Sequence, residues 1–154
     1  MRMDQIDRKI LAALQEDAGR PVADIAAAVG LSQSPCWRRI QKLEADGVIR
    51  GRVALLDAAA LNLSVTAFVA VRTNRHDQEW LETFAEAVDD IPEVVELYRM
   101  SGEVDYMLRV VVPDIAGFDA IYKKLIARVP LSDVTSSFAM EQIKSTTALP
   151  LEYI

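Results

Sequence analysis

The feature that most constrains the fold is a pair of short helical patterns that a single glycine separates. Apolar residues at helical spacing predict one helix that opens at Pro21 and a second that follows Ser32 and runs to about Asp46. Gly30 lies between them and tolerates the left-handed backbone of a tight turn, and Ser32 is a favourable helix cap. A further helical pattern, which Asp4 can cap, precedes the pair. Three helices in fewer than fifty residues predict a helix-turn-helix unit.

The second helix of this pair has a polar face suited to DNA. Its apolar face is formed by Cys36, Ile40 and Leu43, whereas arginine, glutamine, serine and lysine lie opposite. Arginine can bond guanine through two hydrogen bonds, glutamine can bond adenine, and lysine or serine can hold phosphate. The N-terminal part of such a helix meets the base edges. The DNA-binding residues expected on this helix are Gln33, Ser34, Trp37, Arg38, Arg39 and Lys42.

The residues that follow, Val48–Leu56, are expected to form a strand. Arg50 and Arg52 alternate there with apolar residues, which is typical of a strand with one buried face. Such a strand would make the unit a winged helix-turn-helix, and the two arginines would contact the DNA backbone. For the helix between Ser32 and Asp46, the alternative to DNA reading is a solvated helix with ordinary surface charges. For the whole chain, an alternative is a ligand-sensing or assembly protein whose helix-turn-helix has lost DNA binding, which the retained Arg38, Arg39 and Lys42 argue against.

The charge of the chain is distributed unevenly. The formal net charge is −6, which by itself disfavours nucleic acid as a partner. Residues 1–56, however, carry nine Lys or Arg against seven Asp or Glu, whereas residues 57–154 carry eight against sixteen. A basic region on an otherwise acidic molecule is what a modular DNA-binding protein needs.

The second half of the chain has the pattern of an α+β domain. Residues Asp57–Ser64 are rich in alanine and are expected to be a linker, so the predicted domains are 1–56 and 65–154. The patterns then follow the order strand, helix, strand, strand, helix, strand, which is that of a ferredoxin-like domain. The expected strands are Val65–Thr73, Val94–Met100, Asp105–Val112 and Val134–Glu141. The expected helices are Gln78–Ile91, with Leu81, Phe84, Ala85 and Val88 on its buried face, and one that Asp114 caps.

Two of these strands are apolar at both alternating sets of positions, Val65–Val71 and Tyr106–Val112. The two helices can cover only one face of the sheet, and large exposed apolar patches are rare on monomers. The other face is therefore expected to bind a second copy of the chain. A two-fold dimer would place two reading helices on successive turns of the major groove and favour pseudo-palindromic sites in double-stranded DNA.

The hairpin between the second and third strands is a candidate site for a small ligand. Gly102 lets backbone N–H groups converge, which favours a carboxylate, and Glu103 and Asp105 bring negative charge that could hold an ammonium group. A free amino acid carries both groups. The alternative is a plain polar hairpin in which Asp105 caps a turn. The effector-binding candidates are Met100, Gly102, Glu103, Val104, Asp105 and Tyr106, with the hydroxyl-bearing Thr135, Ser136 and Ser137 on the last strand.

Several runs in both halves resemble the Lrp/AsnC family of bacterial and archaeal regulators. They are D-R-K-I-L at Asp7–Leu11, V-G-L-S-x-S-P-C-W-R-R-I-x-K-L-E at Val29–Glu44, D-G-V-I at Asp46–Ile49, S-G-E-V-D-Y at Ser101–Tyr106 and S-S-F-A-M-E-x-I-K at Ser136–Lys144. The resemblance covers nearly the whole chain. It implies a DNA-binding regulator of amino-acid metabolism whose second domain dimerises, builds octameric or related rings, and binds an amino-acid effector between dimers. Glu103 departs from the pattern, since the family often has aspartate there.

Other classes of protein have little support in the sequence. A small ferredoxin-like enzyme is the main rival, but the only histidine, His76, lies in a polar stretch and Cys36 lies on an apolar helix face. No cysteine or histidine cluster has metal-ligand spacing, and no glycine-rich phosphate loop is present. We therefore expect neither catalysis nor a metal or cofactor. No apolar run is long enough to span a membrane, and the N-terminus does not resemble a signal peptide, so the expected location is the cytoplasm.

Overall fold

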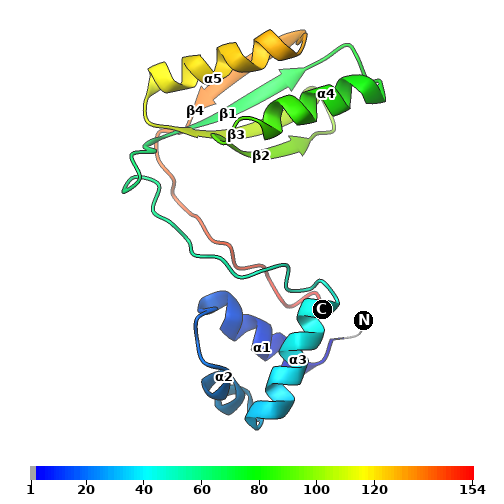
Figure 1. Ribbon diagram of the computed structural model, residues 1–154, viewed down its shortest axis with the longest axis vertical. Coiled ribbons are helices and arrows are strands. Elements are labelled where there is room, and N and C mark those ends of the chain that lie inside the picture. Colours follow the sequence, from blue (N-terminus) through cyan, green and yellow to red (C-terminus); the bar gives the residue numbers. More distant parts are fainter. Residues whose placement is uncertain (1–2) are drawn as a thin grey trace. The chain divides into compact units, whose positions relative to one another are not determined.

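The computed structural model describes residues 3–154, and the chain divides into two compact units (Figure 1). Unit 1 consists of the chain up to Leu55 together with Lys144–Ile154. Unit 2 consists of Leu56–Ile143. The sequence-based boundary after residue 56 lies next to this division. By its contacts, the C-terminal segment Lys144–Ile154 groups with unit 1.

Unit 1 contains the three predicted helices, α1 (Gln5–Glu16), α2 (Val22–Val29) and α3 (Gln33–Ala45). Gly30 ends α2 with φ of 75°, in the left-handed region that a side chain disfavours, and this sets the turn into α3. The helix-turn-helix arrangement is therefore confirmed.

The start of α1 is fixed by a capping box. Asp4 accepts hydrogen bonds from the backbone N–H groups of Ile6 and Asp7, and the Asp7 carboxylate accepts one from the backbone N–H of Asp4. These bonds satisfy N–H groups that have no partner inside a helix.

The core of unit 1 lies where the three helices meet. Cys36, Ile40 and Leu43 of α3 are buried, as the helical wheel predicts, and they pack with Ile10 of α1 and Ile25 of α2. Burial raises the pKa of the Cys36 thiol because it disfavours the charged thiolate. The residues of α3 that face away from this core are thus available to a partner.

The predicted wing strand over Val48–Leu56 is wrong. Across the described residues, no strand forms between the end of α3 and Val65. Val53 and Leu55 are 80% and 71% exposed, so the apolar residues of the alternating pattern do not form a buried face. A strand also needs a neighbour for its backbone hydrogen bonds, and within residues 3–154 no backbone hydrogen bond joins residues 50–56 to another segment.

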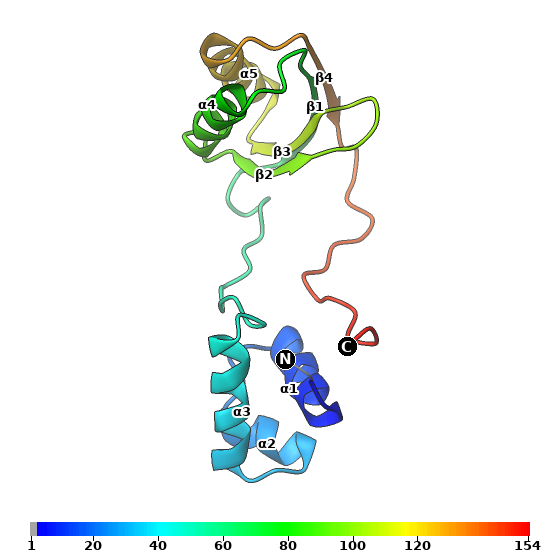
Figure 2. The same cartoon turned by 90° about the vertical axis from the view of Figure 1, so that its right-hand side faces the viewer.

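Unit 2 has the predicted ferredoxin-like order of elements. They are β1 (Val65–Arg72), α4 (Gln78–Asp89), β2 (Val94–Arg99), β3 (Tyr106–Val112), α5 (Ile115–Arg128) and β4 (Asp133–Phe138). The strands form one antiparallel sheet in the order β2-β3-β1-β4, and both helices cover the same face (Figures 1 and 2). Element ends differ from the expected ones by a few residues, most at β4, which ends at Phe138.

The core of unit 2 lies between the sheet and its helices. Phe84 is fully buried, and its ring centroid lies 5.0 Å from that of Trp80 and 5.2 Å from that of Tyr106. The buried face of α4 is rotated slightly from the predicted one: Trp80 and Ala87 are buried, Leu81 is half-buried and Ala85 is exposed. Trp80, and not Ala85, thus belongs to the buried face, because its large ring reaches the sheet from the first turn of α4. Its indole N–H donates to the Pro130 carbonyl at 3.2 Å.

Candidate DNA-binding and effector-binding sites

The outer face of α3 carries most of the predicted DNA-binding side chains. Gln33, Ser34, Arg38 and Lys42 are exposed, and Trp37 is 52% exposed. Within residues 3–154, Arg38 forms no ion pair. The N–H donors of its guanidinium are therefore available to a partner.

Arg39 is placed differently from the prediction. Its guanidinium donates to Asp4 and to Asp7 of α1, each at 2.8 Å, so it bridges the two carboxylates of the capping box. These carboxylates, Asp7 first, raise the pKa of Arg39. In this geometry Arg39 ties the start of α1 to α3 and does not face outward as a base-reading residue would.

The remaining basic side chains around α3 have local carboxylate partners or lie in the open. Lys42 pairs with Asp46 at 2.9 Å, and Arg52 pairs with Glu44 at 2.7 Å. Exposed pairs of this kind are weak, so a phosphate can replace either carboxylate at little cost. Arg50 is exposed and has no ion-pair partner in the described part of the chain.

The Arg39 cluster gives a first prediction, about stability and pH. Arg39→Gln should lower the free energy of unfolding of unit 1 by about 1 kcal/mol, because two charge-assisted hydrogen bonds at a partly exposed site are lost. The Asp7 N–H and the Arg39 guanidinium lower the pKa of Asp4, so the native state favours the ionised carboxylate. The stability that ionised Asp4 contributes is complete at pH values above 3.8, the ordinary pKa of aspartate. It is lost as pH falls through the lower pKa that Asp4 has in the native state.

Thermal unfolding of both proteins between about pH 3 and pH 7 checks this prediction. The difference between wild type and Arg39→Gln should shrink toward the acid end. Arg20→Gln is the control, because Arg20 forms no ion pair within residues 3–154. An unchanged unfolding temperature in Arg39→Gln at neutral pH would contradict the structural role.

The β2–β3 hairpin is held by backbone bonds, and Asp105 has a structural part in it. The Asp105 carboxylate accepts a hydrogen bond from the Thr73 N–H at 2.8 Å, and its own N–H donates to the Val71 carbonyl at 3.0 Å. Gly102 has φ of 110°, which permits the tight turn. Asp105 therefore joins the hairpin to the end of β1, a structural role that differs from capping its own turn. Glu103 is 92% exposed and lies 3.5 Å from Arg72.

The other effector candidates divide between the two faces of the sheet. Tyr106 is buried under the helices beside Trp80, with ring centroids 5.6 Å apart, and Ser136 shares the helix-covered side with its β1 partner Val69. Thr135 and Ser137 alternate with Ser136 and are exposed on the uncovered face. The remaining candidates of the hairpin are Met100, which is 42% exposed, and the half-buried Val104.

The uncovered face also carries groups that sequence reasoning missed. Arg109 of β3 donates to Glu96 of β2 at 3.0 Å, and this contact lowers the pKa of Glu96. Phe68 and Tyr98 are 42% and 54% exposed on the same face. The sequence signal that could have revealed them is Arg109, a charged residue inside an otherwise apolar strand.

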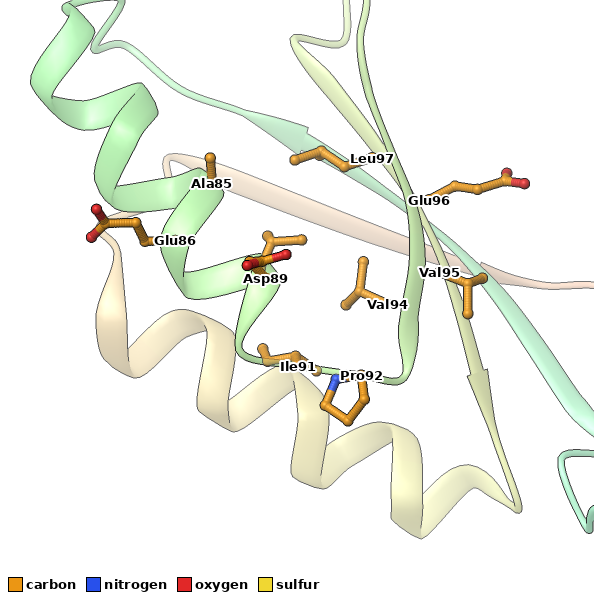
Figure 3. A pocket seen from close by; sticks show the side chains of 10 residues that line it. Ala85, Glu86, Asp89, Ile91, Pro92, Val94, Val95, Glu96 and Leu97 are labelled. Carbon is orange, nitrogen blue, oxygen red and sulfur yellow. The ribbon is translucent and has the colours of Figure 1, made fainter. Parts of the chain in front are cut away.

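A cavity of about 530 Å³ lies in another part of unit 2, between the end of α4 and β2 (Figure 3). Val88, Ile91 and Leu97 line it, with the carboxylates of Glu86 and Asp89 at its rim. None of the effector candidates lies among its lining residues.

Among the helices of the described chain, none is both long and apolar enough to cross a membrane.

A helix-turn-helix with a basic outer face, followed by a ferredoxin-like domain, defines a DNA-binding transcriptional regulator with a ligand-binding domain. Residues 3–44 match the AsnC-type helix-turn-helix domain, and residues 66–149 match the Lrp/AsnC ligand binding domain. The chain belongs to the Lrp/AsnC family of transcriptional regulators. It is similar to the DNA-binding transcriptional activator DecR of Escherichia coli, with 51% identity over 151 residues that cover 97% of this chain and 99% of DecR.

Two solved structures support the same assignment. An AsnC family transcriptional regulator from Agrobacterium tumefaciens is 64% identical, with a TM-score of 0.95 and coverage of 99% of each chain. A transcriptional regulator from Neisseria meningitidis, solved as a complex with L-Met, is 36% identical with a TM-score of 0.94 and the same coverage. The family is one of regulators and not of enzymes.

Proposed function

We propose that α3 reads the major groove of double-stranded DNA with the side chains near its N-terminus. The observation that carries this proposal is the outer face of α3, where Arg38, whose guanidinium has no ion-pair partner among residues 3–154, lies with Gln33 and Ser34. Arg38 would bond a guanine, and Ser34 and Lys42 would hold phosphates. Trp37 packs against a sugar-phosphate edge, and Arg50 and Arg52 contact the backbone from the extended segment after α3.

The uncovered face of the sheet is the proposed dimer interface. Exposed Phe68 and Tyr98 on this face leave an apolar area that water does not solvate well, and a second copy related by a two-fold axis would cover it. The dimer then presents two α3 helices to a pseudo-palindromic operator. Dimers assemble further into an octamer or a related ring, and the protein acts in the cytoplasm without a cofactor.

The proposed effector is an amino acid, bound near the β2–β3 hairpin where two dimers meet. Gly102 and the neighbouring backbone N–H groups receive the carboxylate. Glu103 is the acceptor for the ammonium group, because its carboxylate is almost fully exposed and only 3.5 Å from Arg72, a contact that a ligand can replace. Thr135 and Ser137 add hydroxyl groups from the uncovered face. Ser136, Tyr106 and Asp105 serve the fold of the domain and are not proposed as ligand contacts.

Calorimetric titration with each of the twenty L-amino acids tests the proposal. At least one should bind saturably, and Thr135→Val should raise its Kd by about tenfold, the cost of one lost hydrogen bond. Ser136→Ala is the matched control, because Ser136 lies on the other face, and its Kd should stay close to that of the wild type. Saturable binding by none of the twenty would overturn the amino-acid effector.

A further inference from the structure

The C-terminal segment returns to unit 1 after unit 2 is complete, and it ends beside α1 (Figure 2). Gln15, near the end of α1, makes two hydrogen bonds with Leu149. Its side-chain amide donates to the Leu149 carbonyl at 3.1 Å, and its side-chain oxygen accepts from the Leu149 N–H at 2.7 Å. Both backbone polar groups of Leu149 are therefore satisfied by one side chain of unit 1.

Apolar contacts follow these hydrogen bonds along the chain. Leu151 and Ile154 are partly buried and pack against the core of unit 1. Burial of apolar side chains stabilises the segment on the helices, in addition to the two hydrogen bonds. Since Arg39 holds the start of α1 and Leu149 holds its end, α1 is fixed at both ends by residues from other parts of the chain.

We propose that residues 149–154 are a structural part of the DNA-binding domain, and that the ligand-binding domain is therefore inserted between two parts of the domain that reads DNA. The inference rests on the proposed reading role of α3. Because α1 packs against α3 and is tied to it through Arg39, loss of the C-terminal contact loosens the support of the reading helix. Residues 139–148 connect β4, which carries Thr135 and Ser137, to this segment by a route that does not pass through the linker after α3.

Two variants test this proposal, Gln15→Ala and a chain that ends at Ala148. Gln5→Ala is the matched control, because Gln5 is an exposed glutamine of the same helix without a hydrogen bond from its side chain within residues 3–154. Amide hydrogen exchange reports the contact directly. Gln15→Ala should speed exchange of the Leu149 amide by at least about tenfold, and the shortened chain should speed exchange in the second half of α1.

DNA affinity is the second measurement, with a duplex that the wild-type protein enriches from a random pool. The shortened chain should bind it with a Kd raised about tenfold, although no DNA-facing side chain has changed. Unchanged exchange in α1 together with unchanged affinity would overturn the proposal. If Arg38→Ala keeps full affinity, the reading role of α3 fails, whereas exchange at Leu149 and α1 still decides whether the segment belongs to the domain.

Discussion

Arg38→Ala is expected to raise the Kd for the enriched duplex by about 10- to 100-fold, which corresponds to about 1.4–2.7 kcal/mol. Arg38 lies on the exposed face of α3 and has no ion-pair partner within residues 3–154, so the substitution breaks no ion pair of the folded chain. If Arg38 reads a guanine, preference for that base should relax at one position of each half-site. Fluorescence anisotropy with the enriched duplex and its single-base variants measures both effects.

Lys9→Ala is the charge-matched control for Arg38→Ala. Lys9 is an exposed cation on α1, so its removal lowers the net positive charge of unit 1 by the same amount. We expect it to weaken binding to all duplexes about equally, through the loss of non-specific attraction. An Arg38→Ala protein with full affinity and an unchanged base preference would remove Arg38 from the reading surface.

Phe84→Ala is expected to have the largest effect on stability, about 3–5 kcal/mol in the unfolding of unit 2. Phe84 is fully buried and packs against both Trp80 and Tyr106, and its removal leaves a cavity that rigid aromatic neighbours cannot fill. A typical domain is stable by only about 5–15 kcal/mol, so the variant would lose much of its margin.

Urea unfolding followed by tryptophan fluorescence measures this loss. The chain has two tryptophans, and Trp37→Phe leaves Trp80 as the reporter of unit 2 alone. Thr83→Ala is the neighbouring control, since Thr83 is exposed and should change stability by less than about 0.5 kcal/mol. A loss below about 1 kcal/mol in Phe84→Ala would contradict the close packing around Phe84.

Most of the fold follows from local patterns in the sequence. The three helices of unit 1 and the order of elements in unit 2 were predictable because caps, glycines and apolar periods act over a few residues. The wing strand was not, because the alternation of Arg50 and Arg52 with apolar residues specifies a strand only when a neighbouring strand exists. The return of Lys144–Ile154 to unit 1 depends on contacts across more than a hundred residues, which no local pattern reveals.

The candidate sites divide in the same way. A helical wheel identifies the outer face of α3, and so places Arg38 correctly among the exposed residues. The same wheel cannot show that Arg39 meets Asp4 and Asp7, because those carboxylates belong to another helix. On β4 the alternation of a strand separates Ser136 from its neighbours, but only the register with β1 shows which side the helices cover.

The position of the C-terminal segment has a consequence for synthesis on the ribosome. Proteins are made from the N-terminus, and their domains usually fold in that order. Here the DNA-binding domain begins to emerge first, but it also includes Lys144–Ile154. All of Leu56–Ile143, the ligand-binding domain, is made before those residues. All residues of the ligand-binding domain are therefore made first, and the nascent chain can complete the DNA-binding domain only after residues 144–154 have been added.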